Sequence, residues 1–192
     1  MNTRIRNIKE KLLSDNWYIL KKWTFEYQKN DGSWNEQSRE VYDRGNGATI
    51  LLYNKTEKKI VLTRQFRMPT FLNGNEDGLL IETCAGLLDG DSPEECVRRE
   101  SEEETGFSVC NVKKIYEAYM SPGAVTEIVH LFTGEYSHQN KKGPGGGLAH
   151  EHEDIEVLEI SFEEAKSWLQ NGKIKDGKTI MLLQHAMLSQ IF

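Results

Sequence analysis

In roughly the first 90 residues, apolar positions alternate imperfectly with polar ones or form short runs rich in β-branched and aromatic residues. Such patterns are typical of strands, and Asp31-Gly32 between two of them is typical of a hairpin turn. The same pattern returns after residue 110. We therefore predict strands over residues 17–28, 38–43, 45–54, 58–68, 79–88, 112–120, 127–136 and 155–161.

A helix start interrupts this pattern at Ser92-Pro93-Glu94-Glu95. A serine accepts hydrogen bonds from exposed N–H groups, a proline suits the first helical position, and a glutamate three residues after the serine completes a capping box. The helix is predicted over residues 93–105, with Gly106 as a left-handed terminator.

The C-terminal part repeats these signals. Ser161 and Glu164 predict a second capping box, and Gly172 predicts the end of that helix. Residues 178–192 predict a last helix with one apolar face, and the glycine-rich stretch 143–147 predicts a flexible loop. The sequence thus predicts a mixed sheet flanked by helices over residues 46–192, preceded by a strand-rich extension over residues 1–45.

Composition narrows the class of protein. Of the 192 residues, 38% are hydrophobic and 28% charged, and the net charge is −6, as in soluble globular proteins. There is no long basic run and no apolar stretch of about 20 residues, so we expect no nucleic-acid partner, no membrane span and a cytoplasmic protein. Cys84 and Cys96 are expected to be buried apolar residues rather than nucleophiles.

The chemical signal lies in the stretch RESEEETGF, residues 99–107. At about 100° per residue, Glu100, Glu103 and Glu104 share one helix face, and such a face binds hard divalent cations through oxygen ligands. A solvated acidic surface is the alternative. It is disfavoured because the glutamates occupy the last helical turn, where the helix dipole opposes negative charge.

This stretch resembles the core of the Nudix box, R-E-U-x-E-E-x-G-U, where U is a bulky apolar residue, and Gly86 resembles the glycine that opens that box. The chain departs from the pattern in three ways. The interval from Gly86 to Arg99 is one residue short, Ser92 replaces the first glutamate, and Ser101 replaces an apolar residue. We expect Glu94 or Glu95 to pair with Arg98 or Arg99 instead. The resemblance implies an α/β (α+β) fold, the Nudix α/β/α sandwich.

Pro122 follows Gly106 by sixteen positions, which resembles the ADP-ribose pyrophosphatase branch of the family. Further stretches, from REVYDRGNGATILLYN to DGKT, resemble the GDP-mannose hydrolases of that branch. The resemblance implies Mg²⁺-dependent hydrolysis of a nucleoside diphosphate sugar, most simply GDP-mannose to GMP and mannose 1-phosphate, with Mn²⁺ as a substitute metal. ADP-ribose is the rival substrate. The resemblance also implies a homodimer in which the N-terminal extension pairs with a second subunit.

The family's functional residues map onto matching positions. The implied metal ligands are the Ala85 carbonyl, Glu100, Glu104 and Glu153. The implied catalytic residues are Glu103, Glu104, Glu127 and Glu153. The implied substrate contacts are Trp17, Ser38, Arg39, Glu40, Arg67, Ala85, Gly86, Leu87, Glu104, Glu127, His152, Glu153 and Lys178.

Three other motifs compete with this interpretation. Residues 172–179 match the P-loop pattern, but the preceding segment predicts a helix where a P-loop requires a strand. Residues 150–154, HEHED, could bind a transition metal, and residues 89–93 resemble the start of a calcium loop. A non-catalytic Nudix-like module that binds nucleotides is a further alternative, disfavoured by retention of the glutamates.

Overall fold

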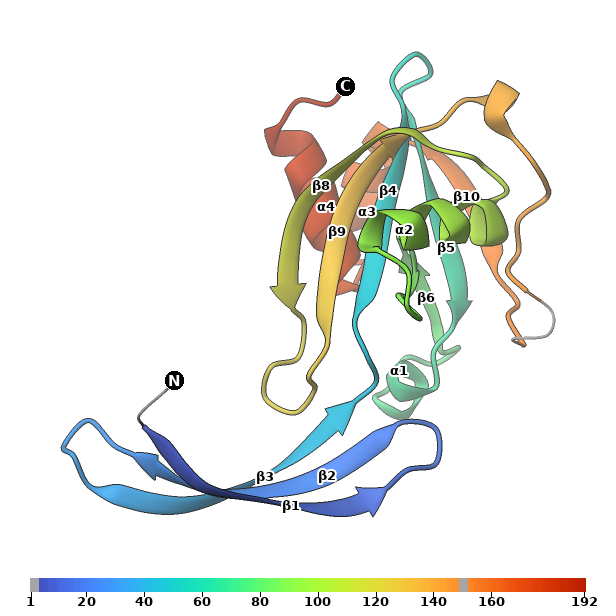
Figure 1. Cartoon of the computed structure of the whole chain (residues 1–192). Helices are drawn as coiled ribbons and strands as arrows, with labels where there is room; N and C mark the ends of the chain where they lie inside the picture. Colours follow the sequence, from blue (N-terminus) through green and yellow to red (C-terminus); the bar gives the residue numbers. More distant parts are fainter. Residues whose placement is uncertain (1–3, 149–151) are drawn as a thin grey trace. The chain divides into compact units, whose positions relative to one another are not determined.

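The computed structural model describes residues 4–148 and 152–192, and the chain divides into two compact units (Figure 1). The first unit comprises the residues up to Asn46 together with Tyr119–Ile128, and the second comprises Gly47–Ala118 and Val129–Phe192. The domain boundary after residue 45 stays a prediction, because the first unit also includes a later segment of the chain.

The first unit is built on a three-stranded antiparallel sheet in the order β1 (Ile5–Ser14), β2 (Ile19–Gln28) and β3 (Trp34–Asp43). The hairpin between β2 and β3 confirms the predicted turn, with Gly32 at φ 83°. Strand β1 was not predicted. Its side chains are nearly all exposed and its register with β2 is irregular, so its sequence carries little alternation.

Residues 119–128 join this unit by pairing with the end of β3. The Tyr42 N–H donates to the Ala124 carbonyl at 2.8 Å, and the Thr126 N–H donates to the Tyr42 carbonyl at 3.1 Å. The Thr126 hydroxyl donates to Asp43 at 2.9 Å. This pairing places Glu127 at 3.7 Å from Arg44.

The second unit contains a seven-stranded mixed sheet. Its main path runs β10-β5-β4-β9-β8, with β6 paired to β5 and β7 paired to β4. Strands β4 and β9 are parallel, whereas β4 and β5 are antiparallel. The strands are β4 (Gly47–Asn54), β5 (Lys59–Phe66), β6 (Leu79–Glu82), β7 (Cys84–Leu87), β8 (Cys110–Tyr119), β9 (Ile128–Glu135) and β10 (Glu156–Ser161).

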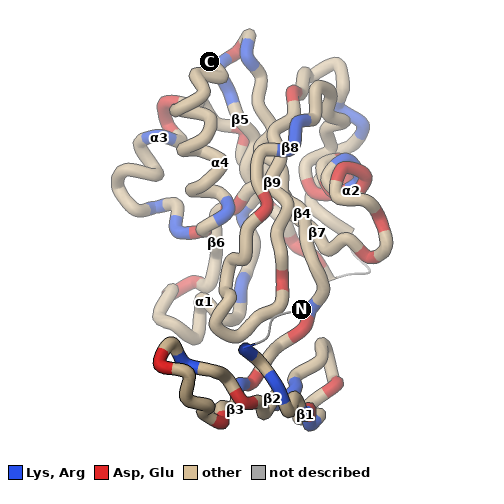
Figure 2. The backbone as a smooth tube through the Cα atoms, turned by 60° about the vertical axis from the view of Figure 1, so that its left-hand side comes forward, with Lys and Arg blue, Asp and Glu red and all other residues tan. Residues whose placement is uncertain are grey.

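Helices cover both faces of this sheet (Figures 1 and 2). Helix α2 (Pro93–Glu100) and its continuation lie on one face, and α3 (Phe162–Gln170) and α4 (Gly177–Leu188) lie on the other. This arrangement confirms the predicted α/β/α sandwich. Two short helices, α1 (Met68–Leu72) and the 3₁₀ helix η2 (His138–Asn140), lie in the connections.

Strand β4 forms the centre of the core, because all of its residues are buried. Ala48, Ile50 and Leu52 belong to a buried cluster with Cys96 and Val97 of α2. Alternate residues of a strand point to opposite faces, so one face of β4 packs against the helix that carries the glutamates. The predicted burial of Cys84 and Cys96 is confirmed.

The single strand predicted over residues 79–88 is wrong. The chain forms two short strands that pair with different neighbours, β6 with β5 and β7 with β4, and the break falls at Thr83. The Thr83 N–H donates instead to the Thr179 hydroxyl of α4 at 2.7 Å. Apolar composition does not reveal such an exchange of partner, because both halves are equally suited to a strand.

Helix α2 begins as predicted. The Ser92 hydroxyl accepts from the Glu95 N–H at 3.3 Å, and the Glu95 carboxylate accepts from the Ser92 N–H at 3.0 Å. The end differs from a plain α-helix, because residues Ser101–Thr105 form one turn of π-helix, η1. Gly106 ends it in the predicted left-handed conformation, with φ 77°.

No helix within residues 4–148 and 152–192 combines the length and the apolar character needed to cross a membrane.

Replacing Ser92 with alanine removes one half of the capping box and leaves helix N–H groups without a partner. We expect the free energy of unfolding to fall by about 1 kcal/mol, measured by urea denaturation. Ser137→Ala is the matched control, because Ser137 also precedes a helix but makes no capping hydrogen bond. Equal stabilities of the two variants would contradict this role for Ser92.

Candidate active site

Arg99 links the start of the box to its carboxylates. Its Nε donates to Asp91 at 3.1 Å, and one terminal nitrogen donates to Glu100 at 2.8 Å and to Glu103 at 3.1 Å. The other terminal nitrogen donates to the Leu87 carbonyl at 3.3 Å. Sequence reasoning missed Asp91, although it lies one residue before the position where the family has its first glutamate.

Arg98, which immediately precedes the core of the box, pairs as expected. Arg98 donates to Glu94, one turn earlier, at 2.8 Å and to the Val109 carbonyl at 2.9 Å. Of the expected pairings, Glu94 with Arg98 is therefore confirmed. Glu95 is used by the capping box instead.

Gly86 lies directly against Glu100. A Cβ built at Gly86 would stand 1.9 Å from the Glu100 carboxylate oxygen and 2.2 Å from its carboxyl carbon. No side chain fits there, so the glycine allows Glu100 to pack onto β7. This close approach, rather than an unusual backbone angle, explains why position 86 is a glycine.

Glu104 is the most enclosed of the glutamates, with a relative exposure of 1%. Its carboxylate accepts a hydrogen bond from the Ala85 N–H at 3.2 Å. Burial raises the pKa of Glu104 to about 8; the Cys84 thiol and the Ala85 N–H lower it, and the charges of Glu100 and Glu153 raise it. Among the described residues Glu104 forms no direct ion pair, and two like charges lie nearby.

Glu100 shows the same effect more weakly. Burial raises its pKa to about 7; the Arg99 charge opposes this, and the charges of Glu103 and Glu153 add to it. Glu102 is exposed and its carboxylate accepts from the Ser108 hydroxyl, so it points away as expected. Figure 2 shows the acidic residues gathered on this helix.

The glycine-rich stretch forms the predicted loop and packs against the end of this helix, and its flexibility stays a prediction. The N–H groups of Gly146 and Gly147 donate to the carbonyls of Glu104 at 2.8 Å and Glu103 at 3.1 Å. A Cβ at Gly145 would stand 2.6 Å from the Glu104 carbonyl oxygen. The loop therefore satisfies carbonyls at the negative end of the helix, which partly offsets the dipole that disfavours glutamates there.

Glu153 contacts the residues next to this stretch. Its carboxylate accepts from the Leu148 N–H at 3.0 Å, and the Ile155 N–H donates to the Gly146 carbonyl at 3.2 Å. Because the charge of Glu153 raises the pKa values of Glu100 and Glu104, the three carboxylates belong to one electrostatic cluster. His152 is exposed, with φ 58°.

Two predicted cations lie beside a buried glutamate that sequence reasoning missed. Glu82, at the end of β6, accepts from Arg67 at 2.7 Å and from Lys178 at 2.5 Å. Lys178 also donates to Asp176, the N-cap of α4, at 3.0 Å. The available signal for Glu82 was a single carboxylate inside an otherwise apolar strand.

The remaining predicted substrate contacts belong to the first unit. Trp17 is 83% exposed. The Ser38 hydroxyl lies 3.0 Å from that of Thr24, and Arg39 donates to the Ser38 carbonyl at 2.7 Å. These residues are Trp17, Ser38, Arg39, Glu40 and Glu127.

The competing motifs find little structural support. Helix α3 precedes residues 172–179, so a strand–loop–helix P-loop is absent from this described segment. Residues 150 and 151 of the predicted transition-metal motif lie outside the described residues. Residues 89–92 lead into the capping box of α2, with Asp91 paired to Arg99.

A different group was not predicted. Among the described residues, only Glu57, His138 and Glu159 place three potential metal-ligand atoms within 4.8 Å of one another. The Lys59 ammonium lies 3.1 Å from Glu57 and 3.8 Å from Glu159, so this group already has a cation and forms a surface ion-pair network.

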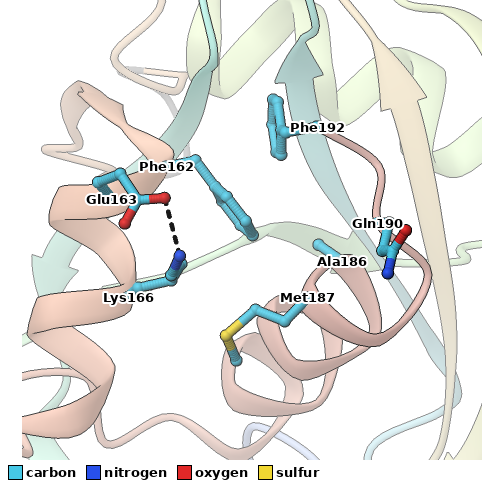
Figure 3. A pocket seen from close by; sticks show the side chains of 7 residues that line it. All are labelled: Phe162, Glu163, Lys166, Ala186, Met187, Gln190 and Phe192. Carbon is cyan, nitrogen blue, oxygen red and sulfur yellow. Dashed lines mark hydrogen bonds and ion pairs between the residues drawn. The ribbon is translucent and has the colours of Figure 1, made fainter.

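A pocket between α3 and α4, lined partly by Phe162, Met187 and Phe192, lies on the sheet face opposite α2 (Figure 3).

Comparison with known proteins identifies the family. Residues 43–183 match the family model described as the NUDIX domain, which covers more than half of the chain. The chain belongs to the Nudix family. Residues 4–42 match a second model, described as the GDP-mannose pyrophosphatase NudK N-terminal domain. Together with the relatives described next, this confirms the expectation of a Nudix hydrolase, and such hydrolases generally use a divalent metal.

Relatives within the Nudix family match along nearly their whole length. A GDP-mannose pyrophosphatase of Pectobacterium atrosepticum is 56% identical over 188 residues, covering 98% of this chain and 96% of the relative. One of Yersinia enterocolitica is 57% identical, covering 98% of this chain and 97% of the relative. One of Salmonella arizonae is 53% identical, covering 100% and 99%.

The predicted metal ligands have donor atoms that suit a hard divalent cation, but the ligand atoms of Glu100, Glu104 and Glu153 do not all lie within 4.8 Å of one another. Glu100, Glu104, Glu153 and the Ala85 carbonyl offer oxygen atoms only, the ligand type that Mg²⁺ and Mn²⁺ prefer. Arg99 compensates the charges of Glu100 and Glu103 in part, and burial still raises the pKa values of Glu100 and Glu104.

Replacing Gly86 with alanine should displace the Glu100 carboxylate. We expect the affinity for Mn²⁺, measured by titration calorimetry, to fall at least about tenfold, with a loss of about 1–3 kcal/mol of stability from overpacking. Gly143→Ala is the control, because a Cβ there meets nothing within 4 Å. Wild-type Mn²⁺ affinity in Gly86→Ala would show that Glu100 does not depend on this contact.

The metal-free protein should lose stability as the pH rises. The folded-state pKa values of Glu100 and Glu104, about 7 and about 8, exceed the ordinary glutamate pKa of 4.5. The folded state therefore holds extra protons above about pH 4.5, and this stabilisation is lost as the pH rises through 7 to 8. We expect the Tm in EDTA to be a few degrees lower at about pH 8.5 than at about pH 6.

Mg²⁺ should raise the Tm more at the higher pH, because it competes with protons for the same oxygens. Glu104→Gln should reduce both the pH dependence and the Mg²⁺ effect. A Tm in EDTA that rises over this pH range would contradict the assignment.

Proposed function

We propose that the protein hydrolyses the pyrophosphate bond of a nucleoside diphosphate sugar in the presence of Mg²⁺, converting GDP-mannose to GMP and mannose 1-phosphate. The proposal rests on two buried carboxylates, Glu100 against Gly86 and Glu104 against the Ala85 N–H. The substrate is supported by the names of the relatives, which match this chain over nearly its whole length.

The proposed metal ligands are the Ala85 carbonyl, Glu100, Glu104 and Glu153. The chemistry supplied by bound Mg²⁺, or by Mn²⁺ in its place, is screening of the pyrophosphate charge and a lowered pKa of a coordinated water. Glu103 is held by Arg99 at 3.1 Å and faces the same cluster. We assign Glu103, Glu127 or Glu153 the task of orienting the water or accepting its proton.

Cationic and aromatic side chains complete the proposed substrate site. Arg67 donates through Nε, and within the described residues both of its terminal nitrogens are available for bidentate hydrogen bonds to phosphate. Lys178 adds a second positive charge, and Trp17 offers an exposed ring for stacking. The full proposed set of substrate contacts is Trp17, Ser38, Arg39, Glu40, Arg67, Ala85, Gly86, Leu87, Glu104, Glu127, His152, Glu153 and Lys178.

We also propose that the protein is a homodimer and that residues 1–45 take part in its assembly. Ile5, Ile8, Leu12 and Leu13 of β1 are between 37% and 58% exposed, and Trp17 follows them. So many exposed large apolar side chains on one strand are typical of a surface that a partner covers. A second subunit is the partner that the family resemblance implies.

ADP-ribose is the second candidate substrate, favoured by the position of Pro122 sixteen residues after Gly106. It differs from GDP-mannose in base and sugar but presents the same pyrophosphate to the carboxylate cluster. The non-catalytic alternative is set aside, because the chain is a Nudix hydrolase and retains all the acidic residues of the proposed metal site.

Product analysis by ion-exchange chromatography tests the proposal. The protein is incubated with Mg²⁺ and either GDP-mannose or ADP-ribose, with EDTA in a parallel reaction. We expect GMP and mannose 1-phosphate, no reaction in EDTA, and turnover by Glu104→Gln lower by at least about 100-fold. Glu102→Gln, which changes a glutamate pointing away from the cluster, is the control.

Each failure has a distinct meaning. Faster cleavage of ADP-ribose would overturn the substrate and keep the site. Unchanged turnover in Glu104→Gln would overturn the metal assignment. Cleavage that persists in EDTA would overturn the metal dependence.

A further inference from the structure

Glu82 is a buried charge that the proposed chemistry does not use. It ends β6, its residue is 3% exposed, and its two carboxylate oxygens have different partners. One oxygen accepts from Arg67 Nε at 2.7 Å, and the other accepts from Lys178 Nζ at 2.5 Å. A single carboxylate thus holds both predicted phosphate-binding cations of the second unit.

The two cations come from different elements. Arg67 follows β5 and immediately precedes the short helix α1, whereas Lys178 lies in the first turn of α4. Asp176 fixes the start of α4 by accepting from the Thr179 N–H at 2.9 Å, and it accepts from Lys178 at 3.0 Å. Through these two hydrogen bonds, Glu82 of β6 contacts both the end of β5 and the start of α4.

The hydrogen bonds of Arg67 leave its phosphate-binding edge available. Its Nε donates to Glu82, and within the described part of the chain neither terminal nitrogen donates to another residue. The side chain is 39% exposed. A guanidinium held at Nε keeps its remaining donors in a fixed plane, which suits bidentate binding of a phosphate.

The electrostatic setting keeps Glu82 ionised. Burial raises its pKa, but the charges and hydrogen bonds of Lys178 and Arg67 outweigh burial and lower it. Burial lowers the pKa of Arg67, and the charges of Glu82, Glu104 and Asp176 outweigh this and raise it. The influence of Glu104 shows that Arg67 lies close to the carboxylate cluster.

We propose that Glu82 is a positioning residue that orients Arg67 and Lys178 toward the pyrophosphate of the substrate. This inference rests on the proposed function, because it gives the two cations the task of binding phosphate. Glu82 acts through the cations and does not touch the substrate itself.

Two variants distinguish the effect of the charge of Glu82 from the effect of its side-chain length. Glu82→Gln keeps the length and removes the charge, whereas Glu82→Asp keeps the charge and shortens the reach. Glu163→Gln is the charge-matched control, because it removes one carboxylate from an exposed pair with Lys166 on α3 (Figure 3). All variants are compared by Tm, by the Kd for inorganic pyrophosphate from calorimetry, and by KM and kcat for GDP-mannose.

A positioning role predicts that both Glu82 variants bind pyrophosphate about tenfold or more weakly. Their KM for GDP-mannose should rise in parallel, and Glu163→Gln should match the wild type. A role as a nearby negative charge predicts the opposite for Glu82→Gln, because removing a negative charge strengthens binding of an anion, and predicts no effect of Glu82→Asp. A purely structural role predicts a lower Tm with unchanged affinity of the folded protein. Either result would overturn the proposal.

The Kd for inorganic pyrophosphate distinguishes failure of this inference from failure of the proposed function. If the wild type does not hydrolyse GDP-mannose, the proposed function fails, and the Kd values still decide the role of Glu82. If the wild type hydrolyses GDP-mannose and both Glu82 variants match it in Kd and KM, the proposed function stands and the inference fails. A wild type that does not bind pyrophosphate would also overturn the inference.

Discussion

The burial of Glu104 is the constraint on which the rest of the site depends. A carboxylate with 1% exposure loses most of its hydration, and within the described chain it forms no direct ion pair and accepts from the neutral Ala85 N–H. Glu100 and Glu153 add like charges. Such an arrangement is costly for the folded protein unless protons or a cation neutralise it.

Three backbone features maintain the cluster. Gly86 lets Glu100 approach β7 more closely than any side chain would allow, and the exchange of strand partners at Thr83 brings the Ala85 N–H to Glu104. The glycine-rich loop donates N–H groups to the carbonyls of Glu103 and Glu104. These contacts stabilise the carboxyl end of a helix that its own glutamates oppose.

The sequence predicted the parts of the site that depend on local signals. The capping box at Ser92, the left-handed stop at Gly106 and the shared face of the glutamates follow from short-range geometry. It did not predict that Thr83 splits a strand, that Asp91 pairs with Arg99, or that Glu82 holds Arg67 and Lys178. Those contacts join residues from separate elements, so only the folded structure reveals them.

The glycine-rich loop shows the same limit in another way. Its composition suggested flexibility, because glycines impose little on the backbone by themselves. In the structure the glycines are required by close approach, since a Cβ at Gly145 would lie 2.6 Å from the Glu104 carbonyl oxygen. Composition alone does not distinguish a loop that needs glycine for packing from one that needs it for movement.

The most direct test of the account is to locate a metal ion. Crystals grown with Mn²⁺ give an anomalous difference peak wherever the ion is ordered. We expect a peak within coordination distance of the Ala85 carbonyl, Glu100, Glu104 and Glu153. A peak only at Glu57, His138 and Glu159, or no ordered Mn²⁺ in the protein, would contradict it.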